Sequence, residues 1–196
     1  MTAQAAILEP FIKGQEGGLS RNTFDPASKL PCPFSYNNLT GWHTNKGITW
    51  QVWSSIHGSD KASADRFFAM SDPDWLTIYK PLFWDKACGD KMKSQRIANI
   101  IVDWVWASGQ YSPEKDTQEI LNHIGGRHLI DEDGAFGDKT IDLMNSEDEN
   151  EVYNELVQRR LKFIDDIIAL NSKLSAFKTD WVRRVNDLAK FNLKFA

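Results

Sequence analysis

The 196-residue chain contains only two cysteines, Cys32 and Cys88. Two cysteines can form at most one disulfide and cannot supply a four-ligand zinc site alone. They are either free thiols or a pair formed in an oxidising compartment, and of these we expect free thiols. No apolar run is long enough to cross a bilayer. The start of the chain lacks the basic and continuous apolar regions of a Sec-type signal. We therefore expect a protein that stays cytoplasmic until it is released or exported to the periplasm or cell wall by another route.

The chain also has no long basic tract, and its formal net charge is −4. This balance argues against a nucleic-acid partner. The residues after 158 are more basic, whereas residues 147–151 form an acidic run. We expect both stretches to form solvated helix faces. The alternative is that the basic end contacts an anionic polymer such as a cell wall. The basic residues concerned are Arg159, Arg160, Lys162, Lys173, Lys178, Arg183, Arg184, Lys190 and Lys194.

Several catalytic and cofactor motifs are missing. The four histidines show no HExxH spacing, and there is no GxGxxG, Walker loop or GxSxG. The segment from Asp131 to Gly134 begins like a calcium loop, but the 12-residue pattern fails. We therefore expect neither a cofactor nor a metal. Acid–base hydrolysis by carboxylates is the chemistry that remains.

The sequence shows almost no sustained period-2 alternation, so we expect a mainly α fold with a small irregular or β-containing lobe near residues 17–47. Eight Trp and eleven Phe indicate a large aromatic core, with a minority of Trp free to stack on sugar rings. The strongest apolar stripe runs through 94–108 and predicts a buried central helix. The other predicted helices cover about 3–16, 49–58, 60–70, a stretch from 71, 112–124, 148–171 and 175–190.

The most informative candidate is Glu16, which is followed at once by Gly17 and Gly18. It continues the row of Leu8 and Ile12 at i+4, and the glycines can end the helix there. Apolar neighbours and the negative end of the helix dipole both disfavour a charged carboxylate in this place. A general acid needs such an environment. The alternative is an exposed glutamate at a frayed helix end.

A general acid needs a second group, and Asp25, Thr44 and Asn45 are the candidates. A loop carboxylate at Asp25 can fold back across a cleft, although it can equally initiate a turn with Pro26. Thr44 and Asn45 can position water or sugar hydroxyls. The simpler reading of this segment is a turn followed by a helix capped by Thr49.

Three segments together resemble glycoside hydrolase family 108, the phage-endolysin-like N-acetylmuramidases. These are Glu16-Gly17-Gly18, Asp25-Pro26 and Thr44-Asn45-Lys46-Gly47-Ile48-Thr49; the segment 79–87 is similar as well. The resemblance implies a lysozyme-like fold and cleavage of the β-1,4 bond between N-acetylmuramic acid and N-acetylglucosamine. It implies that Glu16 is the catalytic acid, and that Asp25 and Thr44 complete the site.

The second half of the chain resembles a predicted peptidoglycan domain. The matching positions are Asp103-Trp104, Ser108-Gly109, 133–137 with Thr140, 159–163 and Trp181. We therefore expect a lysozyme-like catalytic region at 1–92 and a helical peptidoglycan-binding region at 93–196, packed together as one compact unit. The implied partner is the peptidoglycan glycan strand; the oligomeric state is not predicted.

The chain departs from the family pattern in three places. Leu19 replaces a tyrosine, Ala107 replaces an asparagine, and the stretch between Asp25 and Thr44 is longer than the family pattern. That stretch, 26–43, carries Tyr36 and Trp42, which we expect either to bind sugar as part of a cleft wall or to cover the small lobe. The rival functions are a lytic transglycosylase and a non-catalytic peptidoglycan-binding or secretion-associated protein.

Overall fold

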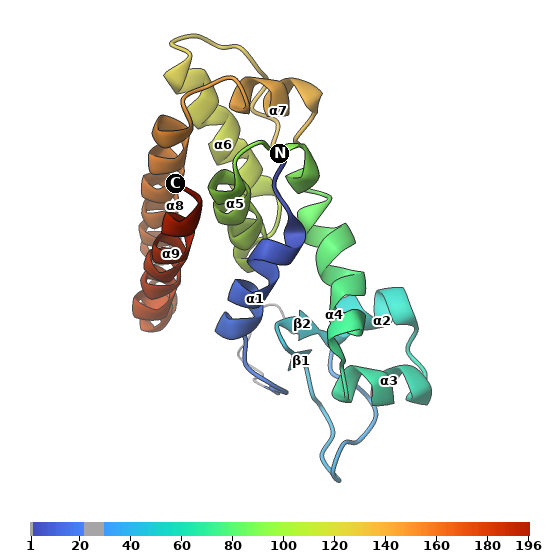
Figure 1. The fold of residues 1–196 in the computed structure, drawn as a ribbon. Coiled ribbons are helices and arrows are strands. Elements are labelled where there is room, and N and C mark those ends of the chain that lie inside the picture. Colours follow the sequence, from blue (N-terminus) through green and yellow to red (C-terminus); the bar gives the residue numbers. More distant parts are fainter. Residues whose placement is uncertain (1, 22–29) are drawn as a thin grey trace. The chain divides into compact units, whose positions relative to one another are not determined.

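The computed structural model describes residues 2–21 and 30–196, and the chain divides into two compact units. One unit comprises the residues up to Phe11 together with Leu82–Ala196, and the other comprises Ile12–Pro81. Within the described residues, the secondary structure is helical apart from one two-stranded antiparallel sheet and two isolated bridges (Figure 1). The predicted mainly α class, with a small β-containing lobe, is confirmed.

The unit Ile12–Pro81 begins within helix α1 (Ala5–Gln15) and contains strands β1 (Thr44–Asn45) and β2 (Ile48–Thr49). Helices α2 (Trp50–His57), α3 (Lys61–Phe68) and α4 (Asp72–Tyr79) follow. Its core is aromatic. Trp50 and Trp53 both contact Phe67, with ring centroids 5.4 and 5.9 Å apart, and Trp75 stacks on Tyr79 at 4.6 Å.

Side-chain caps fix where these helices start. Thr49 accepts a hydrogen bond from the backbone NH of Val52, as predicted for the cap of α2. Ser71 and Asp74 form a reciprocal capping box at α4. Asp60 caps α3, where its carboxylate accepts a hydrogen bond from the backbone NH of Ser63.

The hairpin between β1 and β2 turns through Lys46 and Gly47, whose φ angles are +48° and +79°. Thr44 pairs with Thr49 and Asn45 with Ile48. Two residues with positive φ match the twist of antiparallel strands, and this is the geometry of a type I′ turn. The segment that sequence analysis treated as a turn before a helix is therefore a short hairpin that runs directly into α2.

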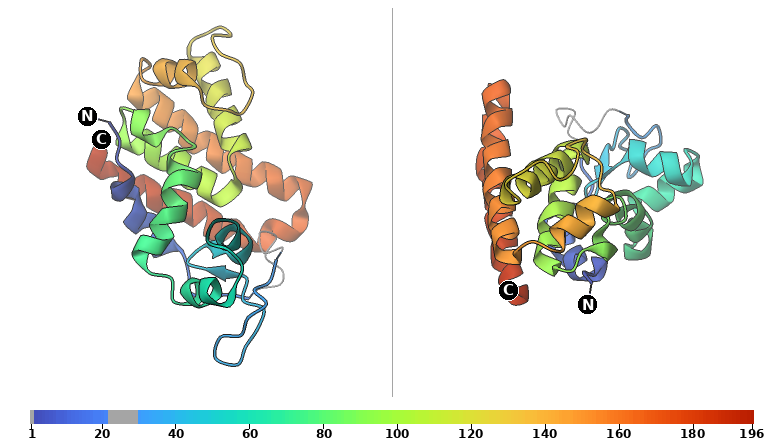
Figure 2. Two further views of the ribbon diagram at one scale, coloured as in Figure 1. Left: turned by 90° about the vertical axis from the view of Figure 1, so that its right-hand side faces the viewer. Right: turned by 90° about the horizontal axis from the view of Figure 1, so that it is seen from above.

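The chain passes from Ile12–Pro81 into the unit that contains Leu82–Ala196 through η1 (Lys80–Trp84), and η2 (Gly89–Lys91) follows. The unit then contains α5 (Gln95–Ser108), α6 (Tyr111–Ile124), α7 (Asp138–Met144), α8 (Glu149–Leu170) and α9 (Lys178–Asn192). The short helices η3 (Ser172–Phe177) and η4 (Leu193–Phe195) flank α9. Figure 2 shows α8 and α9 lying side by side.

Helix α5 is the buried centre of this unit, as its apolar stripe predicted. All its residues from Arg96 to Val105 are buried, and it packs against α6, α8 and α9. Ser94 caps it and Gly109, with a φ of +81°, ends it. The indole of Trp104 meets the ring of Phe163 edge-on at 5.4 Å.

The prediction of a fully solvated basic face was wrong for Arg160, which is only 3% exposed. Its guanidinium donates a hydrogen bond to Asp103 Oδ2 at 2.7 Å, and Arg184 donates to Oδ1 of the same carboxylate at 2.8 Å. Burial alone would raise the pKa of Asp103, but the two guanidinium groups hold it below its usual range. Part of the basic C-terminal region therefore neutralises a buried acid on α5.

Candidate functional site

Glu16 lies directly after the last residue of α1 and is half-buried. Its backbone NH donates to the carbonyl of Lys13 at 3.3 Å, which completes a final turn before the exposed Gly17 and Gly18. The helix therefore ends just before the double glycine, one residue earlier than predicted. The carboxylate is held at the end of a rigid element and keeps access to solvent.

The segment that follows Glu16 returns to the hairpin. Ser20 forms an isolated bridge with Thr44, in which Ser20 NH donates to Thr44 O at 2.8 Å and Thr44 NH donates to Ser20 O at 3.0 Å. Four residues span at most about 14 Å. The structure thus brings Glu16 and the predicted Thr44 into one region, and Thr44 lies half-buried in β1.

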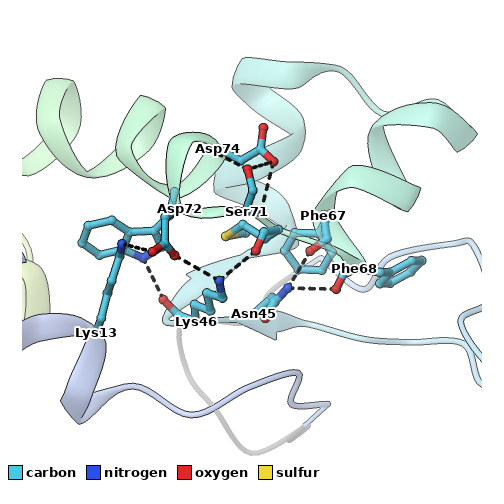
Figure 3. A network of polar contacts seen from close by, with 10 residues as sticks. Lys13, Asn45, Lys46, Phe67, Phe68, Ser71, Asp72 and Asp74 are labelled. Atoms are coloured by element: carbon cyan, nitrogen blue, oxygen red, sulfur yellow. Dashed lines mark hydrogen bonds and ion pairs between the residues drawn. The ribbon is translucent and has the colours of Figure 1, made fainter. Parts of the chain in front are cut away.

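A polar network ties the end of α1 to the hairpin turn and to the start of α4 (Figure 3). Asp72 lies 3.1 Å from the ammonium group of Lys13 and 3.4 Å from that of Lys46. Lys46 also donates to the carbonyl of Met70 at 2.8 Å. The hydrogen bond from Lys13, supported by Lys46, lowers the pKa of Asp72.

Trp75 reinforces the same junction from α4. Its indole NH donates to the carbonyl of Lys46 at 3.1 Å, and the ammonium of Lys13 lies 5.1 Å from its ring centroid. Lys13 precedes Glu16 by three residues, and Lys46 follows Thr44 by two. These contacts therefore hold the two candidate catalytic positions on one framework.

Asn45 is 4% exposed, and its amide nitrogen donates to the backbone carbonyls of Phe67 and Phe68 at 2.6 and 3.3 Å. Those carbonyls belong to the last residues of α3, where helical partners are lacking. The side chain anchors the hairpin to α3. Its predicted contact with sugar stays a prediction.

Tyr36 and Trp42 lie together, with their rings edge-to-face at a centroid distance of 6.4 Å. Tyr36 is 37% exposed and packs against Phe68 at 5.1 Å. Backbone bonds between Cys32 and Trp42 and between Tyr36 and Leu39 give this segment its own small fold. The aromatic pair presents one exposed ring, which suits sugar stacking.

Asp25 lies outside the described residues, and its predicted position across a groove from Glu16 stays a prediction. Both cysteines are free thiols, with Cys32 buried and Cys88 half-buried. Among the residues at 2–21 and 30–196, no helix has the length and apolar character needed to cross a membrane.

The family model for glycosyl hydrolase 108 matches residues 10–109, which include Glu16 and Thr44. The chain belongs to the glycosyl hydrolase 108 family. A second model, described as a predicted peptidoglycan domain, matches residues 113–186. Together, the two matches give this glycosyl hydrolase 108 protein a hydrolase domain, peptidoglycan as a partner and a peptidoglycan-related function.

SagA from Brucella abortus is similar in structure, with a TM-score of 0.72 and 24% identity over 97% of this chain and 94% of that one. The likeness supports the expected lysozyme-like, mainly α fold. No curated protein matches the sequence. The two family matches are separated at residues 110–112, and the predicted boundary between residues 92 and 93 stays a prediction.

Sequence reasoning did not find the Lys13–Asp72–Lys46 contacts of this glycosyl hydrolase 108 protein. Lys13 lies three residues before the motif that begins at Glu16, and Lys46 lies within the motif 44–49. Asp72, in contrast, is a helix-start residue 26 positions beyond Lys46. A pattern within one segment carries no signal for a partner in another. The nearness of Lys13 to Glu16 and of Lys46 to Thr44 was the available clue.

Proposed function

We propose that the protein is an N-acetylmuramidase that hydrolyses the β-1,4 bond between N-acetylmuramic acid and N-acetylglucosamine. Membership of the glycosyl hydrolase 108 family supports hydrolysis, and the peptidoglycan domain match supports the substrate class. The observation that carries the proposal is the Ser20–Thr44 bridge, because it brings the segment after Glu16 alongside the strand that holds Thr44.

In this mechanism Glu16 protonates the glycosidic oxygen as the bond to the leaving sugar breaks. Asp25 stabilises the developing oxocarbenium ion or orients the attacking water, and Thr44 helps to place that water. Support for Glu16 comes from its place at the end of α1, where the Lys13–Asp72–Lys46 network fixes the backbone. Tyr36 is the exposed ring available for stacking on a neighbouring sugar.

The test is release of soluble muropeptides from purified peptidoglycan, with products identified by mass spectrometry. Glu16→Gln should lower the rate by about a hundredfold or more, because general acid catalysis contributes about that much. Glu9→Gln, which removes a charge from the same helix, serves as the matched control and should retain activity. Equal activity of wild type and Glu16→Gln would refute the assignment.

Two further outcomes identify the rival functions. Products with 1,6-anhydro ends would show that the muramic acid hydroxyl, and not water, attacks, as in a lytic transglycosylase. Binding to wall material with no product from the wild-type protein would show a non-catalytic binder. Asp25→Asn tests the second carboxylate, since a residue that only starts a turn would leave most of the activity intact.

A further inference from the structure

A groove of about 580 Å³ lies in the unit formed by residues up to Phe11 and Leu82–Ala196, and its lining residues all come from α6 and α8. The two helices pack against each other (Figure 2). Sites for small ligands commonly enclose about 300–1,000 Å³. All of its lining residues except Tyr111 and Ser112 lie within the predicted peptidoglycan domain at residues 113–186.

One edge of the groove carries an exposed aromatic ring. Tyr111, the first residue of α6, is 61% exposed. A β-carbon at Gly134 would lie 2.6 Å from Cδ2 of this tyrosine, so the ring rests directly on the glycine backbone. Gly134 has a φ of +73°, which glycine adopts without strain. The ring is therefore seated on a loop while most of its surface faces water.

Three planar polar groups that line the groove are hydrogen-bonded to one another. Arg159 Nη1 donates to Asp116 Oδ1 at 2.9 Å and to Glu119 Oε2 at 2.6 Å. These three side chains keep exposed fractions of 29%, 20% and 34%. Burial raises the pKa of Asp116, and the hydrogen bond from Arg159 opposes that effect. The groups are held in place yet can still bind a ligand.

The charges around the groove cancel. Lys115, Arg159 and Lys162 balance Asp116, Glu119 and Asp166. A site for a polyanion would carry an excess of positive charge. A neutral ligand with many hydroxyl and amide groups fits better, because carboxylates accept hydrogen bonds from hydroxyls and guanidinium groups donate to carbonyl oxygens.

We propose that the α6–α8 groove binds a neutral N-acetylated sugar of a glycan strand, with the Tyr111 ring against one face of the sugar. Asp116, Glu119 and Arg159 then hydrogen-bond its hydroxyl and acetamido groups. The proposal rests on the proposed action on peptidoglycan, and it gives the second domain a task distinct from bond cleavage: to hold the strand that the residues around Glu16 cut.

The test uses the full-length Glu16→Gln protein, so that the sugar is not cleaved, and a soluble tetramer of N-acetylglucosamine as the probe. Backbone NMR signals report where the probe binds. We expect saturable shifts at Gly134, which the Tyr111 ring contacts, and at Lys115, which lines the groove. The position of the signals separates this groove from sugar bound near residue 16.

Two substitutions test the residues. Tyr111→Ala should weaken binding at these signals by about twofold to tenfold, the range expected for one aromatic contact, whereas Tyr111→Phe keeps the ring and should bind like the parent. Arg159→Lys keeps the charge but loses the planar fork and should also weaken binding. Leu170→Ala is the control, since Leu170 is 88% exposed on α8 outside the groove.

Unchanged signals at Gly134 and Lys115 with the sugar would refute the proposal, whether or not Glu16→Gln abolishes cleavage. Shifts at these signals with a free stem peptide, and none with the sugar, would also overturn it and make the groove a peptide site. Loss of cleavage in Glu16→Gln is a separate result, so the two proposals fail independently.

Discussion

Glu114 offers a stability measurement whose sign and size follow from its place in the fold. This carboxyl lies in the first turn of α6 with no exposed surface, and its Oε2 accepts a hydrogen bond from the backbone NH of Phe136 at 2.9 Å. Burial raises its pKa to about 7, with hydrogen bonds and Lys86 opposing and the charge of Asp133 adding to the rise. At pH values between the ordinary pKa and this raised pKa, the folded state therefore holds a proton that the unfolded chain has lost.

A raised acid pKa costs stability as pH rises. Below the ordinary value of 4.5 the carboxyl is protonated in both states. Between 4.5 and about 7 the folded protein binds more protons than the unfolded chain, so the free energy of unfolding falls as pH increases. At about 1.4 kcal/mol per pH unit, the total loss is on the order of 3 kcal/mol, and it is complete above the folded pKa.

Glu114→Gln removes the titration but keeps an oxygen for the NH of Phe136. We expect the variant to be more stable than wild type by about 2–3 kcal/mol at pH 8, and to show little advantage at pH 4.5. Urea denaturation at several pH values measures this difference. The control for loss of one acidic charge is Glu119→Gln, at a position on the same helix that lines the α6–α8 groove. A constant difference between Glu114→Gln and wild type across this pH range would refute the reasoning.

Two further predictions concern the charged networks. Asp72→Asn should barely change the urea midpoint, because exposed ion pairs contribute little to stability. It should nevertheless slow muropeptide release, because Lys13 and Lys46 lose their common partner. Unchanged release would show that the network does not position Glu16. Asp103→Ala should destabilise the protein by about 3–5 kcal/mol in urea, since it leaves two guanidinium groups without their buried acid; a loss below about 1 kcal/mol would contradict this.

Much of the helical fold was predictable because its signals are local. The stripe through 94–108 repeats at the helical period, and Ser94, Thr49 and Ser71 begin helices by accepting bonds from backbone NH groups within their own first turns. The hairpin at 44–49 was harder to predict. Its strands are two residues long, too short for alternation to show, and positive φ at Lys46 gives no sequence signal when the residue is not glycine.

The sequence predicted the residues of the candidate site but not the contacts that hold them in place. Family motifs identified Glu16 and Thr44, whereas Asn45 proved to be anchored on α3 through its amide. That contact joins residues 22 positions apart, and the pairing of Lys46 with Asp72 joins residues 26 apart. Such pairings depend on how helices return to the hairpin, which periodicity within a single helix does not describe.

The same limit explains why the basic C-terminal region was misread. Arg160 and Arg184 look like members of charged helix faces, but their partner Asp103 lies on α5, within the stretch matched to glycosyl hydrolase 108. Both arginines lie in the stretch matched to the predicted peptidoglycan domain. The buried acid therefore lies in one matched stretch, and the two arginines that neutralise it lie in the other. Helix α5 needs both stretches, because without the arginines Asp103 would be a buried, unpaired charge. The boundary between the two family matches is therefore not a boundary in the core of this unit.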